Sequence, residues 1–243
     1  MITAIVQARV GSTRYPNKIF AEICGKPIIW HIINRLRYSS GIDKIVIATT
    51  INLKDDLVES WAIDNNLDVY RGSEEDVLER YYNASMKFGI DTIVRTTSDD
   101  PFKDPEIIDK VIDLFYKKNL DFAYNNNPPS FPEGLDAEVF SFGALETAQN
   151  KSYDNYEREH VTQYFYRNPA RFRQMNLLNP VNYSYLRWTV DTQQDFDMVN
   201  TVYQHLYKEN EIFLMKDILQ LLERNPQIPL MNADVKRSDM YIK

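Results

Sequence analysis

The sequence predicts an α/β protein, a three-layer α/β/α sandwich around a mostly parallel, twisted sheet. Short runs of β-branched residues alternate with longer helical patterns through the first half of the chain. This alternation is typical of strand–helix–strand units, which place helices on both faces of a parallel sheet. Right-handed crossover connections then leave few topologies. The length of 243 residues suits a single domain.

The predicted elements of the first half follow from apolar runs and helical periodicity. Strands are predicted at residues 2–6, 44–49, 68–70, 92–96 and 121–124, and helices at residues 27–36, 54–64, 74–88 and 104–117. The last of these helices has the clearest start. Asp104 is a favourable N-cap, Pro105 suits the first helical position, and Glu106 lies in the first turn.

The alternation breaks at Asn125, where an Asn- and Pro-rich loop begins. Beyond it, extended segments are predicted at 137–142 and 171–176, a helix at 157–167 and a strand at 186–190. Thr192 then caps another helix, and Asp195 completes a capping box three residues later. We expect one domain spanning residues 1–243, in which residues 125–185, approximately, form an inserted acceptor-binding subdomain.

Composition excludes several classes of protein. Lys and Arg total 28 and Asp and Glu total 35, which gives a formal charge of −7. An acidic chain is a poor candidate for binding nucleic acid or an anionic membrane. The single cysteine, Cys24, excludes an intrachain disulfide and a cysteine-cluster metal site. No targeting segment or membrane-spanning stretch is visible, so a cytoplasmic protein is expected.

A basic loop, residues 7–18, directly follows the first predicted strand. It concentrates Arg9, Arg14 and Lys18 in an otherwise acidic chain, and Gly11 and Ser12 are small enough to let backbone N–H groups approach an anion. Ligands of open α/β sheets bind at the carboxyl ends of the strands. Arg and Lys at such a place suit a triphosphate. An ordinary basic surface loop is the competing interpretation.

Two further strand ends carry aspartates. Asp99 and Asp100 follow one strand, and Asp191 follows another just before the helix capped by Thr192. Mg²⁺ in proteins is commonly held by one or two carboxylates together with phosphate oxygens. The competing interpretations are a turn stabilised by Asp and a supplementary helix cap. The three groups together favour a metal–phosphate site.

These segments resemble the bacterial cytidylyltransferase family that contains the acylneuraminate and Kdo cytidylyltransferases, and in particular its SpsF-like spore-coat polysaccharide branch. The resemblance covers nearly the whole chain in order. It is carried by residues 5–18, 71–78, 95–105, 133–140, 157–167 and 189–192. The branch commonly has Gly-Asp-Cys-Pro where this chain has Ser98-Asp99-Asp100-Pro101, so the extra Asp100 leaves open which carboxylate holds the metal.

The resemblance implies a fold like that of the nucleotide-diphospho-sugar transferases, and roles for named residues. It implies nucleotide contacts by Gln7, Ala8, Arg9, Gly11, Ser12, Arg14, Lys18, Arg71, Ser73, Thr97 and Asp99. It implies a Mg²⁺ cofactor on Asp99 and Asp191, with catalysis carried by Arg9, Lys18, Asp99 and Asp191. It implies acceptor contacts by Asp136, Glu138, His160 and Tyr164.

The expected reaction transfers CMP from CTP to a small acidic sugar or related acceptor and releases pyrophosphate, in the synthesis of surface polysaccharide or glycoconjugates. The alternatives are a nucleotide-sugar-dependent glycosyltransferase of similar fold, a cytidylyltransferase acting on a small phosphorylated polyol, and a nucleotide-sensing module without enzymatic activity. No nucleic-acid or membrane partner is expected. Members of the family are often dimers, so the resemblance suggests a homodimer.

Overall fold

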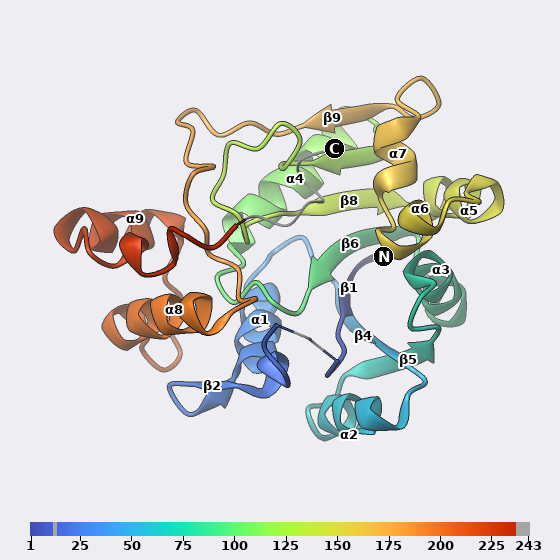
Figure 1. Ribbon diagram of the computed structural model, residues 1–243. Helices are drawn as coiled ribbons and strands as arrows, with labels where there is room; N and C mark the ends of the chain where they lie inside the picture. Colours follow the sequence, from blue (N-terminus) through green and yellow to red (C-terminus); the bar gives the residue numbers. More distant parts are fainter. Residues whose placement is uncertain (12–13, 237–243) are drawn as a thin grey trace.

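A computed structural model describes residues 1–11 and 14–236. Its main sheet has seven strands in the order β5-β4-β1-β6-β8-β7-β9 (Figure 1). They are β1 (Ile2–Gln7), β4 (Lys44–Thr50), β5 (Asp68–Gly72), β6 (Thr92–Thr97), β7 (Phe122–Tyr124), β8 (Glu138–Ser141) and β9 (Gln174–Asn176). A small antiparallel pair, β2 (Glu22–Ile23) and β3 (Lys26–Pro27), lies outside the sheet.

The sheet is mostly parallel, as predicted. β8 runs antiparallel to both of its neighbours, β6 and β7, whereas β5, β4, β1 and β6 pair in parallel, as do β7 and β9. β4 and β6 flank β1 on opposite sides. The order of the strands therefore reverses between β1 and β6, and ligands of open α/β sheets bind at such a point.

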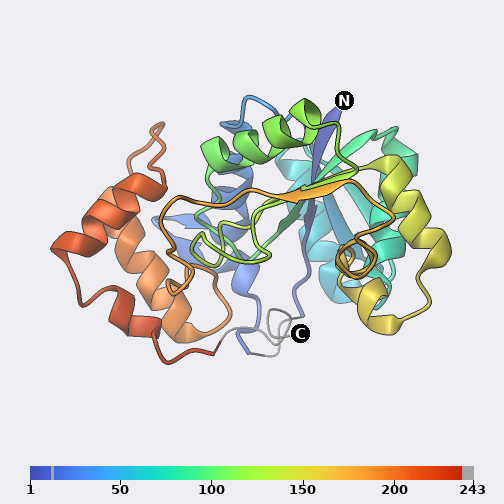
Figure 2. The same ribbon diagram turned by 90° about the horizontal axis from the view of Figure 1, so that it is seen from above.

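Helices cover both faces of the sheet (Figure 2). They are α1 (Ile28–Arg37), α2 (Asp56–Asp64), α3 (Val77–Phe88), α4 (Pro105–Lys117), α5 (Phe142–Lys151), α6 (Asn155–Glu159), α7 (Gln163–Arg167), α8 (Gln193–Leu206) and α9 (Met215–Arg224), with short 3-10 turns η1 (Lys18–Phe20), η2 (Leu53–Asp55) and η3 (Pro229–Asn232). No helix in the described part of the chain is long and apolar enough to cross a membrane.

Alternation along the strands divides the core into two layers. Ala4 and Val6 of β1 belong to a cluster with α1, α2, α4, α8 and α9. Ile5, between them, belongs to a second cluster with α3, α5 and α7. Successive side chains of a strand point to opposite faces, so this division confirms the predicted three-layer sandwich.

The two predicted helix caps are present. Asp104 Oδ1 accepts hydrogen bonds from the backbone N–H groups of Glu106 and Ile107 at the start of α4. The hydroxyl of Thr192 accepts from Asp195 N, and the Asp195 carboxylate accepts from Thr192 N, which is the predicted capping box of α8.

Residues 125–185 are continuous with the sandwich. β8 and β9, which come from this segment, extend the central sheet, and α5 and α7 add to the second core layer. Asn125 fixes the loop between β7 and β8, because its side chain donates to Leu135 O and accepts from Ala137 N. Whether the segment binds an acceptor stays a prediction.

The predicted strand at 186–190 is wrong. The segment joins no ladder and makes one isolated bridge, between Glu133 and Arg187. Its backbone donors have other partners, since Trp188 N donates to Glu133 O at 2.8 Å and Val190 N donates to Asp99 O at 2.8 Å. These bonds tie the segment to two loops instead of a neighbouring strand.

Candidate nucleotidyltransferase site

The carboxyl ends of β1 and β6 lie side by side, because the two strands pair from Ile2 opposite Thr92 to Gln7 opposite Thr97. The basic loop leaves β1 at this edge, and the aspartates leave β6 there. The bond from Val190 N to Asp99 O brings Asp191 to the same place from far along the chain. Three segments that the sequence singled out therefore converge at the reversal of strand order.

Lys18 lies between two of the predicted carboxylates. Its Nζ is 3.0 Å from Asp99 Oδ2 and 2.8 Å from Asp191 Oδ1, and it also donates to Val190 O at 2.9 Å. Arg14 Nη2 approaches the other oxygen of Asp191, Oδ2, at 3.0 Å. The arrangement concentrates two cations and two carboxylates at one point.

Mutual attraction favours the charged forms of Asp99 and Lys18. Burial alone would raise the pKa of Asp99, but the Lys18 charge and the hydrogen bond from Lys18 lower it to about 2. Burial opposes the charged form of Lys18, but Asp99 and Asp191 outweigh it and raise the pKa of the ammonium. At neutral pH Asp99 and Lys18 therefore form an ion pair.

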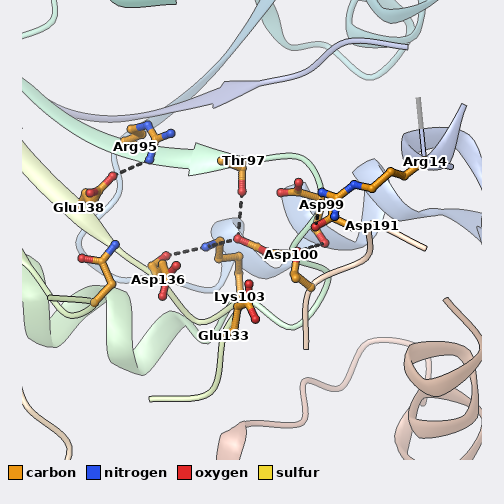
Figure 3. Close-up of a pocket in the computed structure, with 13 residues that line it drawn as sticks. Arg14, Arg95, Thr97, Asp99, Asp100, Lys103, Glu133, Asp136, Glu138 and Asp191 are labelled. Atoms are coloured by element: carbon orange, nitrogen blue, oxygen red, sulfur yellow. Dashed lines mark hydrogen bonds and ion pairs between the residues drawn. The ribbon is translucent and has the colours of Figure 1, made fainter. Parts of the chain in front are cut away.

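Asp99 and Asp100 face different surroundings, which separates the two candidates for metal binding (Figure 3). Asp99 faces Lys18, whereas Asp100 Oδ2 pairs with Lys103 Nζ at 2.8 Å and accepts from the Thr97 hydroxyl at 2.9 Å. Both Asp100 and Lys103 are buried. The structure therefore brings Asp99 close to Asp191 and places Asp100 in a buried ion pair with Lys103.

One cavity, of about 360 Å³, lies on the β1 side of Asp99. We call it the nucleotide-side cavity. It is lined by the predicted residues Gln7, Ala8, Arg9, Gly11, Arg14, Lys18, Thr97 and Asp99, and also by Glu74, Val77, Arg80, Ser98, Glu159, His160 and Asp191. Ser12, also predicted to contact the nucleotide, lies outside the described residues.

A second cavity, of about 160 Å³, lies on the β8 side, and we call it the acceptor-side cavity. Figure 3 shows its lining, which consists of Arg14, Arg95, Thr97, Asp99, Asp100, Lys103, Asn126, Glu133, Gly134, Asp136, Glu138, Thr189 and Asp191. Arg14, Thr97, Asp99 and Asp191 line both cavities. We call the place where Lys18, Asp99 and Asp191 come together the convergence point. Two ligands, one in each cavity, would meet there.

Glu138 of the acceptor-side cavity is held rigidly. Its carboxylate is buried and accepts from Arg95 Nη1 at 2.6 Å, from the Thr162 hydroxyl at 3.0 Å and from the Tyr166 hydroxyl at 2.8 Å. The sequence predicted Glu138 and Asp136 at this cavity. It did not predict that Arg95, Thr162 and Tyr166 would donate to the Glu138 carboxylate. Arg95 is the charged residue within β6, and this was the available signal.

Two predicted nucleotide contacts do not reach either cavity. Arg71 donates to the carbonyls of Thr50 and Asn52 and pairs with Glu59 at 2.7 Å, so its guanidinium braces the loop after β4. The Ser73 hydroxyl accepts from Asp76 N, ahead of α3. In this structure both residues have structural partners and do not line the nucleotide-side cavity.

The predicted helix at 157–167 is split into α6 and α7, and this changes two acceptor predictions. Val161 between them has a φ of 51°, which ends the helical hydrogen bonding. His160 and Tyr164 therefore do not share a helix face. His160 lines the nucleotide-side cavity, and Tyr164 is buried against Phe172 in the core. Tyr166, two residues later, is the α7 tyrosine that reaches Glu138.

The residues present fit a divalent cation. Two carboxylates from separate segments already converge on one ammonium group, and hard cations such as Mg²⁺ prefer oxygen ligands. Among residues 1–11 and 14–236, no group of three or more His, Cys, Asp or Glu side chains could form a metal cluster by itself. The two carboxylates would leave the remaining positions around a metal to substrate oxygens and water.

Comparison with known structures and sequences agrees with this geometry. The fold matches that of nucleotidyltransferases, and the solved structure of a cytidylyltransferase from Leptospira borgpetersenii superposes with a TM-score of 0.90 at 30% identity, covering 98% of both chains. The family model described as cytidylyltransferase matches residues 3–235. The chain belongs to this cytidylyltransferase family.

Two curated relatives extend the comparison. The spore coat polysaccharide biosynthesis protein SpsF of Bacillus subtilis is 32% identical over 93% of this chain and 95% of its own length. A 3-deoxy-manno-octulosonate cytidylyltransferase of Geobacter metallireducens is 31% identical over 46% of this chain and 43% of its own length. The expected SpsF-like branch is confirmed.

Proposed function

We propose that this cytidylyltransferase transfers CMP from CTP to a small acidic sugar, with release of pyrophosphate, for the synthesis of a surface polysaccharide. The observation that carries the proposal is the position of Lys18, Asp99 and Asp191 where the two cavities meet. The α-phosphorus of CTP would lie at this junction, with the nucleoside in one cavity and the acceptor in the other.

In the proposed reaction, an acceptor hydroxyl gives up its proton to water, and its oxygen forms a bond to the α-phosphorus as the bond to pyrophosphate breaks. Positioning and charge neutralisation contribute most of the rate enhancement in such transfers. Arg9, Arg14 and Lys18 would hold the triphosphate and stabilise the charge on the departing pyrophosphate. Asp99 and Asp191 would hold Mg²⁺, which, when bound, would neutralise phosphate charge and favour ionisation of the acceptor hydroxyl.

The acidic acceptor is supported by the similarity to one group of relatives. Cytidylyltransferases of 3-deoxy-manno-octulosonate, a sugar acid, resemble about half of this chain. The acceptor-side cavity offers three cations, Arg14, Arg95 and Lys103, of which Arg95 pairs with Glu138 and Lys103 with Asp100. A small phosphorylated polyol could use the same three cations.

The experiment is a measurement of pyrophosphate release with each of the four ribonucleoside triphosphates and a panel of acceptors. The panel contains sugar acids, their uncharged parent sugars and phosphorylated polyols. We expect release with CTP and a sugar acid, at a rate that depends on Mg²⁺. Release with uncharged sugars or phosphorylated polyols, and none with sugar acids, would refute the proposal that the acceptor is acidic. Equal release with all four triphosphates would refute the proposal that the nucleotide is CTP.

A second assay addresses glycosyl transfer. A glycosyltransferase would bind a sugar nucleotide more tightly than the free triphosphate. We expect CTP with Mg²⁺ to raise the melting temperature more than UDP-glucose does. The opposite order would favour the glycosyltransferase.

A further inference from the structure

Arg187 is buried beneath the candidate site and contacts three carboxylates. Its Nη1 is 2.9 Å from Glu133 Oε1, its Nη2 is 3.0 Å from Asp191 Oδ2, and its Nε is 2.9 Å from Asp195 Oδ1. Only 7% of the residue is exposed. The guanidinium thus connects the wall of the acceptor-side cavity, the convergence point and the start of α8.

The two carboxylate oxygens of Asp191 have different partners. Oδ2 accepts from Arg187, a buried planar group with a fixed fork of donors. Oδ1 faces Lys18. With Oδ2 held in this way, rotation of the carboxylate away from the convergence point would break a buried charge-assisted hydrogen bond.

Arg187 is itself held in place by Asp195. The Asp195 carboxylate is fully buried and accepts from Arg187 through both oxygens, at 2.9 and 3.0 Å. Its Oδ2 also accepts from the backbone N–H groups of Asp191 and Thr192. The carboxylate therefore fixes both the side chain of Arg187 and the backbone of Asp191.

The last member of this network comes from the C-terminal part of the described chain. Asn232 of η3 is buried, and its Nδ2 donates to Asp195 Oδ1 at 2.9 Å and to Arg187 O at 3.0 Å. η3 packs on α8. A side chain that lines neither of the two candidate cavities is thereby connected through two buried residues to Asp191.

We infer that Arg187 is a positioning residue that presents Asp191 Oδ1 to the metal, and that Asn232 sets the position of Arg187 through Asp195. The inference rests on the proposed function, because it assigns the metal to Asp99 and Asp191. A purely structural role would make the network contribute to stability and leave the response of the nucleotide complex to metal unchanged.

The test compares Asn232→Ala with Asn225→Ala. Asn225 is the matched control, because its Nδ2 donates within α9, to Leu221 O at 3.0 Å, and not to a member of the network. For each protein, calorimetry measures the Kd of CTP in EDTA and in Mg²⁺. The ratio of the two constants reports the contribution of the metal at equilibrium, without turnover. Melting temperatures are measured in parallel.

We expect the wild type and Asn225→Ala to have the same ratio, and Asn232→Ala to have a ratio at least fivefold smaller. Excess Mg²⁺ should restore part of the CTP affinity of Asn232→Ala. Arg187→Lys, which keeps the charge but cannot fork across three carboxylates, should show the same effect and provides the test if Asn232→Ala does not fold.

An unchanged ratio in Asn232→Ala and Arg187→Lys, with lower melting temperatures alone, would overturn the inference and leave the proposed function intact. A wild-type protein whose CTP affinity does not respond to Mg²⁺ would overturn both the metal assignment and this inference.

Discussion

Adjacent Asp99 and Asp100 illustrate how neighbouring residues acquire different roles. Asp99 is partly exposed at the junction of the cavities, whereas Asp100 is buried in an ion pair with Lys103. We predict that Asp99→Asn reduces turnover by more than 100-fold with little change in melting temperature. Pyrophosphate release and thermal unfolding of the variant provide the two measurements.

Asp100→Asn should behave in the opposite way. Removing one partner of a buried ion pair leaves Lys103 uncompensated, which costs about 3–5 kcal/mol of stability. The melting temperature should fall clearly, while the folded fraction keeps measurable turnover. If Asp100→Asn were stable and inactive and Asp99→Asn active, the assignment of the metal to Asp99 would be wrong.

His160 gives a prediction that departs from the family resemblance. The resemblance implies an acceptor contact, but His160 lines the nucleotide-side cavity and packs edge-on against Tyr156 at 4.4 Å between ring centroids. His160→Ala should therefore raise the KM for CTP severalfold and leave the KM for the acceptor unchanged. His205→Ala, at an exposed histidine bonded to Thr201 O, is the control. A change confined to the acceptor KM would restore the original assignment.

His31 predicts how stability depends on pH. It is buried against the ring of Tyr203, and its Nε2 bonds to Ile23 O at 2.8 Å. Burial lowers the pKa of His31 to about 4, against about 6.5 in the unfolded chain. Below pH 6.5 the unfolded state binds a proton that the folded state refuses, so stability falls as the pH falls towards 4.

Protonation of His31 in the unfolded chain should lower the free energy of unfolding at pH 5 by about 2 kcal/mol relative to pH 7. Urea unfolding of the wild type and of His31→Gln, which keeps a donor for Ile23 O, measures it. The difference in unfolding free energy between the two proteins should shift in favour of the variant by about this amount between pH 7 and pH 5. A difference that stays constant over this range would contradict the assignment.

At the scale of the elements, the position of segment 186–191 depends on one glycine, Gly134, against which its backbone packs. Gly134 has a φ of 102°, and a Cβ there would lie 2.9 Å from the Trp188 carbonyl carbon and 3.0 Å from Thr189 N. Backbone atoms cannot move aside cheaply. We predict that Gly134→Ala costs about 2 kcal/mol or more and lowers turnover, because it displaces the segment that carries Asp191.

Gly89→Ala separates strain from steric clash. Gly89 also has a positive φ, 63°, but a Cβ there would meet nothing within 4 Å. The Gly89→Ala variant should lose about 1 kcal/mol of unfolding free energy and keep full turnover. Thermal unfolding and pyrophosphate release of both variants make the comparison, and equal losses in the two variants would show that no clash occurs at Gly134.

The sequence predicted the regular elements well because their signals are local. Periodicity marked the strands of the parallel half, and the caps at Asp104 and Thr192 follow from short-range hydrogen bonding. The errors have non-local causes. The segment 186–190 resembles a strand, but its partners are the loops at Glu133 and Asp99. The helix at 157–167 is interrupted by a left-handed residue, Val161, that no glycine or proline marks.

The candidate site was predictable to the extent that its residues follow strands. The basic loop and Asp99 were found because strand ends converge in a parallel sheet. Asp191 was found through a predicted strand that the structure does not contain, and it reaches the same place through the bond from Val190 N to Asp99 O. Arg71 was misplaced because Glu59 and two carbonyls satisfy it locally. Arg187 and Asn232 carried no signal in the sequence, since their importance arises from contacts between segments far apart in the chain.

At the scale of the whole molecule, strand order explains why the two cavities meet at one point. β1 lies between β4 and β6, and β8 extends the sheet beyond β6 in the reverse direction. The nucleotide-side cavity therefore opens over β1 and α3, and the acceptor-side cavity over β6 and β8. Asp99 and Asp191 lie between them, so a phosphorus atom bound there is accessible from both sides.

The central claim is that this junction binds a cytidine triphosphate through Asp99, Asp191 and a divalent cation. Calorimetric titration of the protein with CTP, UTP, ATP and GTP, each with and without Mg²⁺, tests it most directly, with Asp99→Asn/Asp191→Asn as the comparison. We predict that CTP binds at least tenfold more tightly than the other triphosphates, that Mg²⁺ strengthens its binding, and that the double variant loses the Mg²⁺ effect. Equal affinity for all four nucleotides, or an Mg²⁺ effect that survives in the double variant, would contradict the account.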